Sequence, residues 1–274
     1  LLNPEAARRR QTISVHIEVD TGMGRTGVDP DQVEELLRAC QGEYVRLEGI
    51  YTHFPVADRD LSFTRGQLAE FGRLTARLRQ QGLKFIQHAA NSSGLLNVTE
   101  SALDMVRPGL AIYGILPNGC RDHLRTCLPL RPVMTLRSRI VNLRQFPPGR
   151  SVSYERSFIT TRDSRIAVIS AGYGDGYPRG LSNRGMVLVR GRRAPIVGTV
   201  CMDLTMIDVT ECEDVSIGDV VTLLGQDGDD CLTANELANW AGTIPYEITC
   251  RISPRVPRVF RSGGKIMGIR NRLT

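Results

Sequence analysis

Lysine is scarce in this sequence: of its 35 basic residues, only Lys84 and Lys265 are lysines. The sequence also has no apolar run close to the ~18 residues that a membrane-spanning helix needs, so no such helix is predicted. The formal net charge of +6 is a mild excess, and the basic residues are not gathered with aromatic residues into one face. These features do not predict a nucleic-acid-binding protein.

Paired cysteines are missing as well. The seven cysteines are odd in number, widely spaced and contain no C-x-x-C motif. Zinc sites need clustered ligands and disulfide frameworks need paired cysteines, so we predict neither a metal site nor a disulfide scaffold. Reduced cysteines are typical of a cytoplasmic protein, and we expect that location.

The first half of the chain alternates strand and helix patterns. Alternating apolar and polar residues at 15–19 are typical of a strand. Asp29-Pro30 resembles the start of a helix that runs to about Cys40, and helical spacing returns at 68–78 before a stop at Gly82. Three further strands are predicted at 47–52, 85–90 and 105–113. Strands separated by helices predict parallel β/α units.

The second half has a different texture. Apolar β-rich runs recur, separated by Gly and Pro, and they predict an antiparallel β domain. One clear helix is expected after Thr233, which forms a capping-box pattern with Glu236. We place the domain boundary after residue 127, giving a β/α domain at 1–127 and a β domain at 128–274.

Four β/α strands are half the number of a (β/α)8 barrel. Polar residues follow each predicted strand at its C-terminal end, where such barrels gather their ligands. Because half a barrel exposes unpaired strand edges, we expect the other half to precede Leu1, and the missing initial Met agrees with a truncated chain.

Several of these strand-end residues carry chemistry. Taken singly, an Arg at a strand end is usually a surface ion-pair partner, a His on a strand is usually a core residue, and Gly22-Met23-Gly24 is equally consistent with a simple turn. Their convergence at one end of parallel strands instead predicts a pocket for a ligand with phosphate and carboxylate groups. The converging residues are Arg25, His53, His88, Ser92, Arg107 and Gly109.

Eight motifs, in order over almost the whole chain, resemble those of alanine racemase. Four lie in the first half: DTGMGR at 20–25, THF at 52–54, HAANS at 88–92 and RPGLAIYG at 107–114. Four lie in the second: VSY at 152–154, GYGDGY at 172–177, GTVCMD at 198–203 and RVPR at 255–258.

This resemblance implies a pyridoxal 5'-phosphate enzyme with a barrel domain followed by an antiparallel β domain. The family works as a homodimer and interconverts L- and D-alanine, the latter for cell-wall peptidoglycan. The fold class implied here is the C-terminal half of a pyridoxal-phosphate-binding (β/α)8 barrel followed by that β domain.

The resemblance also implies roles for the pocket residues. Arg107 would face the pyridine nitrogen and, because a guanidinium keeps its protons, would donate to it and leave it unprotonated. His88 would orient Arg107, and His53 would lie on or near the ring. Arg25 would reach the phenolic oxygen and the substrate. The phosphate would be held by Ser92, the amides of Gly109 and Leu110, and Tyr246.

Racemisation needs proton transfer on both faces of the α-carbon. In the family a Schiff-base lysine and a tyrosine do this, and the tyrosine matches Tyr154. By itself Tyr154 resembles a packed strand aromatic. The resemblance implies that it enters the partner's barrel, together with the substrate-binding Met202 and Asp203.

Two positions depart from the family pattern. No lysine matches the cofactor lysine of the first barrel strand, because Lys84 precedes a strand and Lys265 lies in a polar tail. We therefore expect the chain to be truncated and inactive alone. Glu18 stands where many members have a lysine, and we expect its carboxylate to orient Arg25.

Two alternatives stay open at this point. The chain could belong to a racemase for another small amino acid such as serine, since the sequence does not reveal the pocket width. It could also be a non-catalytic protein that binds pyridoxal phosphate without a covalent bond.

Overall fold

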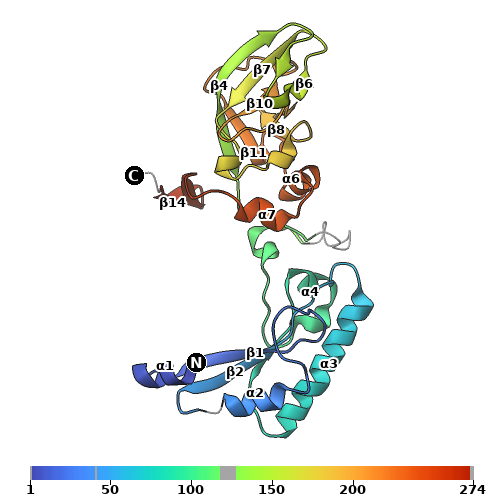
Figure 1. The fold of residues 1–274 in the computed structure, drawn as a ribbon, viewed down its shortest axis with the longest axis vertical. Helices are drawn as coiled ribbons and strands as arrows, with labels where there is room; N and C mark the ends of the chain where they lie inside the picture. Colours follow the sequence, from blue (N-terminus) through green and yellow to red (C-terminus); the bar gives the residue numbers. More distant parts are fainter. Residues whose placement is uncertain (1, 41, 118–127, 272–274) are drawn as a thin grey trace. The chain divides into compact units, whose positions relative to one another are not determined.

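Two groups of strands organise the chain, as the computed structural model shows for residues 2–40, 42–117 and 128–271 (Figure 1). Contacts divide it into two compact units, Leu1–Arg131 and Pro132–Thr274. The domain boundary expected after residue 127 adjoins residues 118–127, which lie outside the described residues, and it stays a prediction.

The first unit contains a parallel sheet with the order β1-β2-β3. Helices α2 and α3 pack against it, because Val33 and Leu37 of α2 join Phe71 of α3 and Ile50 of β2 in one buried cluster. Apolar residues at helical and strand spacing thus meet in a common core. The elements are α1 (Leu2–Arg9), β1 (Ile13–Glu18), α2 (Val33–Ala39), β2 (Val45–Tyr51), α3 (Leu61–Gln80), β3 (Ile86–His88) and α4 (Ser92–Asn97).

The strand predicted at 105–113 is mostly not a strand. Met105 makes a single parallel bridge to His88, and a 3-10 helix, η2, covers Leu110–Tyr113. Pro108 has no N–H to continue a ladder, which explains why pairing ends here. Residue 107 nevertheless stays beside β3, since its amide donates to Ala90 O at 2.9 Å.

Both predicted helices exist, but their starts differ from the prediction. Helix α2 begins at Val33 instead of near Asp29, whose carbonyl accepts from the Gln32 amide in a preceding turn (2.9 Å). Helix α3 begins at Leu61 instead of near 68, because the Asp60 side chain caps it by accepting from Phe63 N at 2.9 Å. Gly82, with φ of +86°, follows its end as predicted.

The second unit is antiparallel, as predicted. Its seven-stranded sheet has the order β10-β7-β4-β11-β8-β9, with β12 paired to β11. A hairpin, β5–β6, carries the segment before Tyr154. The strands are β4 (Leu136–Phe146), β5 (Ser151–Val152), β6 (Phe158–Ile159), β7 (Ser164–Ile169), β8 (Met186–Val189), β9 (Arg192–Pro195), β10 (Thr205–Asp208), β11 (Val220–Asp227) and β12 (Asp230–Leu232).

Helix α6 (Ala234–Ala241) has the predicted capping box: Thr233 Oγ1 accepts from Glu236 N at 3.2 Å, and Glu236 accepts from Thr233 N at 2.9 Å. The sequence did not predict helix α7 (Pro245–Cys250) or the hairpin of β13 (Arg258–Ser262) and β14 (Lys265–Arg270). Among the described helices, none has both the length and the apolar character needed to cross a membrane.

Candidate active site

Arg107 is the centre of a polar cluster at the C-terminal ends of β2 and β3. One terminal nitrogen, NH1, contacts His88 Nδ1. The other, NH2, donates to Thr52 O at 2.8 Å and Ala89 O at 3.3 Å and lies 3.3 Å from His53 Nδ1. Within the described parts of the chain, no hydrogen bond uses the Nε–H of Arg107, so this donor is available to a ligand.

His88 is held in its neutral form. It is only 3% exposed, and its ring stacks on Tyr51 with centroids 4.8 Å apart and planes at 9°. Burial, followed by the positive charge of Arg107 and by the neighbouring His16, lowers the pKa of His88 to about 4. A neutral imidazole can accept at Nδ1 from the permanently charged guanidinium, as the geometry requires.

His53, which contacts the other terminal nitrogen of Arg107, is half-buried. Burial is the largest cause that lowers its pKa, followed by the charges of Arg107 and Arg25, while Glu18 acts in the opposite direction. His53 is therefore also suited to face a ligand as a neutral ring.

Glu18 makes different contacts from those predicted. Its carboxylate accepts from Thr26 Oγ1 at 2.7 Å and from Tyr51 Oη at 3.0 Å, and its described contacts include no bond to Arg25. The reason is register: Glu18 pairs with Tyr51 on the adjacent strand, while Arg25 lies exposed in the following loop.

The loop at 20–25 is shaped by Asp20, whose role the sequence reasoning missed. Its carboxylate accepts from the amides of Gly22 (2.8 Å), Met23 (2.7 Å) and Gly24 (2.8 Å), and these bonds lower the pKa of Asp20. An Asp before a Gly-rich turn is a recognisable signal for such a capped loop. The glycine amides are thus used within the loop itself.

Ser92 connects α4 to the segment after Arg107. Its buried Oγ accepts from the amides of Gly109 at 2.9 Å and Ala111 at 3.2 Å. The Gly109 amide, expected to hold a phosphate, therefore donates to Ser92 in this structure. Gly109 itself is exposed, and a Cβ built on it meets no atom within 4 Å, so open space adjoins this segment.

The other predicted residues belong to the second unit. Tyr154 is 69% exposed and lies in a strained stretch, since Ser153, Glu155 and Arg156 all have positive φ (70°, 60° and 51°). Ser153 anchors this stretch by donating from Oγ to Thr199 O at 2.7 Å. Backbone strain of this kind is concentrated at functional sites.

Met202 and Asp203 lie on an exposed loop that side-chain and backbone hydrogen bonds hold in place. Arg255 donates to Asp203 Oδ1 at 2.7 Å and to Asp175 Oδ1 at 2.8 Å. The segment at 172–174 supports the same loop. The Tyr173 amide donates to Cys201 O at 2.9 Å and the Gly174 amide to Met202 O at 2.8 Å, and a Cβ on Gly172 would stand 2.4 Å from Met202 O. Sequence reasoning missed Arg255 and Asp175 as supports, although both stand inside the quoted motifs.

The structure brings some predicted residues together and assigns others to separate units. Arg107, His88 and His53 are in contact, and Ser92 and Gly109 are in contact. Tyr246 is exposed at the start of α7. The first unit holds Arg25, His53, His88, Ser92, Arg107, Gly109 and Leu110, and the second holds Tyr154, Met202, Asp203 and Tyr246.

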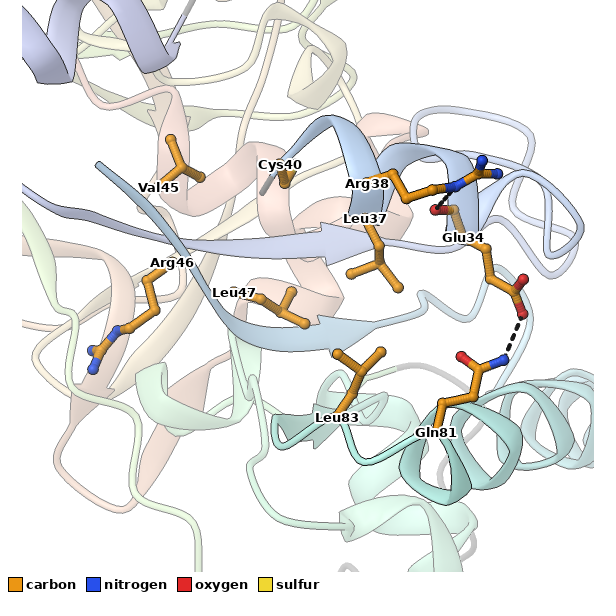
Figure 2. Close-up of a pocket in the computed structure, with 9 residues that line it drawn as sticks. All are labelled: Glu34, Leu37, Arg38, Cys40, Val45, Arg46, Leu47, Gln81 and Leu83. Carbon is orange, nitrogen blue, oxygen red and sulfur yellow. Dashed lines mark hydrogen bonds between the residues drawn. The ribbon is translucent and has the colours of Figure 1, made fainter. Parts of the chain in front are cut away.

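The first unit also has a hollow of about 500 Å³ that is separate from the Arg107 cluster (Figure 2). It borders the start of β2, at Val45 and Leu47, whereas the predicted residues follow the end of β2. Figure 2 shows Leu37 and Leu83 facing into it. Gln81 Nε2 donates to Glu34 Oε1 at 3.3 Å. The hollow contains none of the predicted site residues. The exposed Lys84, directly after Leu83, is at this opposite end, as predicted.

Comparison with known proteins gives one consistent family. The model "Alanine racemase, N-terminal domain" matches residues 1–117, and "Alanine racemase, C-terminal domain" matches residues 133–260. Because the first match begins at residue 1, it lends no support to the expected loss of an upstream segment. An alanine racemase of Halothermothrix orenii is 45% identical over 95% of this chain and 69% of its own length.

Solved structures agree. The alanine racemase of Clostridium difficile 630 superposes with a TM-score of 0.90 at 34% identity, over 100% of this chain and 71% of that one. The alanine racemase of Bartonella henselae, described with covalently bound pyridoxal phosphate, gives a TM-score of 0.78 at 31% identity, over 92% and 67% of the two chains. The predicted fold class, a barrel-type domain followed by an antiparallel β domain, is thereby confirmed. The chain belongs to the alanine racemase family, the pyridoxal-phosphate-dependent isomerases that interconvert L- and D-alanine.

Proposed function

We propose that the first unit binds pyridoxal phosphate through the Arg107 cluster and that Tyr154 moves a proton at the α-carbon of alanine. The supporting observation is the state of Arg107. Four contacts fix its guanidinium, and none of them uses its Nε–H. A pyridine nitrogen is an acceptor that this N–H suits.

The remaining donors fit the rest of the group. The hydroxyl of Ser92 accepts two amide bonds, so its own proton is available to an acceptor such as a phosphate oxygen. Arg25, Gly109, Leu110 and Tyr246 are proposed to complete the binding set, with Arg25 also reaching the substrate. When bound, pyridoxal phosphate withdraws electrons from the substrate and makes the α-proton labile.

The chain's residues then have distinct tasks. Arg107 keeps the ring nitrogen unprotonated, because a guanidinium does not give up a proton near neutral pH. Tyr154 supplies or removes the α-proton on one face. The Met202 backbone lies near the substrate carboxylate, and Asp203 belongs to the same substrate-binding set. We propose that neither Lys84 nor Lys265 holds the cofactor, since the exposed Lys84 precedes β3 and Lys265 begins the exposed strand β14.

The test uses two proteins: the chain itself and a hybrid. The hybrid joins this chain to the part of the Halothermothrix orenii relative that the chain does not cover. Borohydride reduction with pyridoxal phosphate, followed by peptide mass spectrometry, identifies the labelled lysine. We expect the hybrid to racemise L-alanine and to carry label on neither Lys84 nor Lys265. Label on either would contradict the assignment. Cofactor binding without racemisation would indicate a binding protein, and faster turnover of L-serine would indicate the other substrate.

We further propose a homodimer in which Tyr154 serves the partner's Arg107 cluster. An Arg107→Gln hybrid and a Tyr154→Phe hybrid are each expected to be inactive. Mixed dimers would have one intact site of two, so exchange between the two proteins should restore about a quarter of wild-type activity. No recovery, with mixed dimers shown by mass spectrometry, would mean that both residues come from one chain.

A further inference from the structure

His16 on β1 touches the far side of His88. Its Nδ1 lies 2.6 Å from His88 Nε2, and the two ring centroids are 4.9 Å apart. His16 Nε2 in turn lies 3.9 Å from Glu48 Oε2 on β2. Three strands thus contribute one line of groups: Glu48, His16, His88 and then Arg107.

The two ends of this line fix where its protons are. Arg107 can only donate, so His88 Nδ1 must accept and His88 carries its proton on Nε2. That proton faces His16 Nδ1, which must accept, so His16 carries its proton on Nε2. A carboxylate only accepts, and Glu48 stands on that side. Every N–H in the line therefore points from Arg107 toward Glu48.

Space for His16 depends on one glycine. A Cβ built on Gly49 would stand 2.3 Å from His16 Nδ1 and 2.5 Å from its Cε1, so the ring occupies the volume that any side chain there would take. Gly49 is opposite His16 in the strand register. The glycine therefore has a specific effect: it allows the imidazole to lie over β2 and reach His88.

Other charged groups adjoin the line but do not replace its members. Arg46 lies 3.8 Å from Glu48, and the Tyr51 ring stacks on His88 and also lies 4.8 Å from Arg107 Cζ. Glu18, two residues after His16, is bonded to Tyr51 and Thr26.

From this arrangement we infer that His16 is a positioning residue. It accepts the Nε2–H of His88 and so holds the His88 ring with Nδ1 toward Arg107, which fixes the orientation of Arg107. The inference rests on the proposed function for its consequence in catalysis. No contact of His16 with Arg107 itself is found among the described residues. Its effect is to keep one hydrogen-bonding partner of Arg107 in place, so the N–H groups that Arg107 has left over keep their directions.

The first test reads tautomers in the chain without cofactor. The sequence has only four histidines, so ¹⁵N-histidine spectra are assignable by substitution. In the wild type we expect His88 to be protonated on Nε2 alone at pH 7. Gly49→Ala should displace His16 and leave the Nε2–H of His88 without its acceptor. The His88 ring can then turn away from Arg107 and populate both tautomers, and His16→Phe should have the same effect. His16→Asn keeps an acceptor near the Nδ1 position and should retain the wild-type signal.

Glu48→Ala should leave the His88 tautomer unchanged, because Glu48 Oε2 lies 3.9 Å from His16 Nε2, beyond hydrogen-bond distance. Glu100→Ala, which removes an exposed carboxylate bonded to Arg65, should change neither ring. Unfolding curves show whether each variant is folded. An unchanged His88 tautomer in folded His16→Phe would overturn the inference. If Gly49→Ala does not fold, His16→Phe and His16→Asn decide the question.

The second test uses the racemising hybrid. In His16→Phe we expect kcat to fall about 10-fold, with KM for alanine changed less than about twofold, and His16→Asn to recover most of the loss. If the hybrid does not racemise although the tautomers respond as expected, the proposed function fails and the positioning stands. If it racemises and His16→Phe leaves both tautomers and kcat unchanged, the positioning is wrong and the proposed function stands.

Discussion

Arg107 donates to the carbonyl oxygen of Thr52 across 2.8 Å, joining positions 55 residues apart in the chain. The bond connects the end of β2 to the segment after β3. It also satisfies a backbone carbonyl on a buried residue, since Thr52 has no exposed surface. Arg107 is therefore part of the fold as well as a candidate ligand-binding group.

Replacing Arg107 by Gln should affect both properties. The Thr52 and Ala89 carbonyls and His88 lose a charged donor, and we expect a loss of about 1–3 kcal/mol in the free energy of unfolding. Binding of pyridoxal phosphate, measured by fluorescence quenching, should weaken. Arg59→Gln, at a highly exposed arginine, should change stability by less than about 0.5 kcal/mol and leave binding intact. Equal effects of the two changes would contradict this view.

His88 predicts a pH dependence. Its pKa is about 4 in the folded protein and near the ordinary value of 6.5 when unfolded, so the unfolded chain binds the proton first as the pH falls. The stability that His88 contributes is fully present above pH ~6.5 and is lost between pH ~6.5 and ~4. Urea unfolding at pH 7 and 4.5 should show a smaller drop for His88→Gln than for the wild type. The same drop in both proteins would argue against a neutral, buried His88.

Tyr154→Phe should separate activity from stability. The side chain is largely exposed, so we expect stability to stay within about 0.5 kcal/mol of the wild type. Racemisation by the hybrid should fall by about 10²–10⁴-fold, as expected on loss of an acid–base group. Tyr44→Phe, in the first unit, is the matched control and should retain activity. Full activity in Tyr154→Phe would remove this residue from the mechanism.

Gly172→Ala should disturb the Met202 loop. The added Cβ would stand 2.3 Å from Cys201 O and 2.4 Å from Met202 O, which are backbone atoms that cannot turn aside. We expect a loss of about 1–3 kcal/mol in urea unfolding. Gly66→Ala, in helix α3 with no atom within 4 Å of the new Cβ, should instead raise stability by about 0.5–1 kcal/mol. A neutral Gly172→Ala would show that the loop adjusts freely.

Elements with long periodic patterns were predictable from sequence. The strand at 13–18, the helix α3 and the antiparallel second half follow from local apolar spacing, and the Thr233 capping box is local too. The strand expected at 105–113 failed because its apolar residues are used in a 3-10 helix after Pro108. Short elements near proline are decided by contacts that spacing alone does not contain.

The site was predictable in its membership more than in its contacts. The ends of parallel strands lie at one edge, which correctly placed Arg107, His88 and His53 near one another. The prediction that Glu18 bonds to Arg25 was wrong, because the strand register places Tyr51 beside Glu18 and the Tyr51 hydroxyl donates to its carboxylate. Arg255 contacts Asp175 and Asp203, which are 80 and 52 residues away in the sequence, and no local sequence pattern predicts contacts at such separations.

The edge of β1 that does not face β2 affects how the chain behaves in solution. Among the described strands β1 pairs only with β2, and on its other edge Val28 N donates to Glu18 O at its C-terminal end. A largely apolar hollow lined by Val15, Ile17 and Val28 adjoins β1. Unpaired backbone N–H and C=O groups of an edge strand readily form hydrogen bonds with a strand of another molecule. Concentrated solutions of the chain by itself should consequently self-associate. A peptide that pairs with this edge of β1 as an added strand should reduce the self-association. Light scattering would measure the difference.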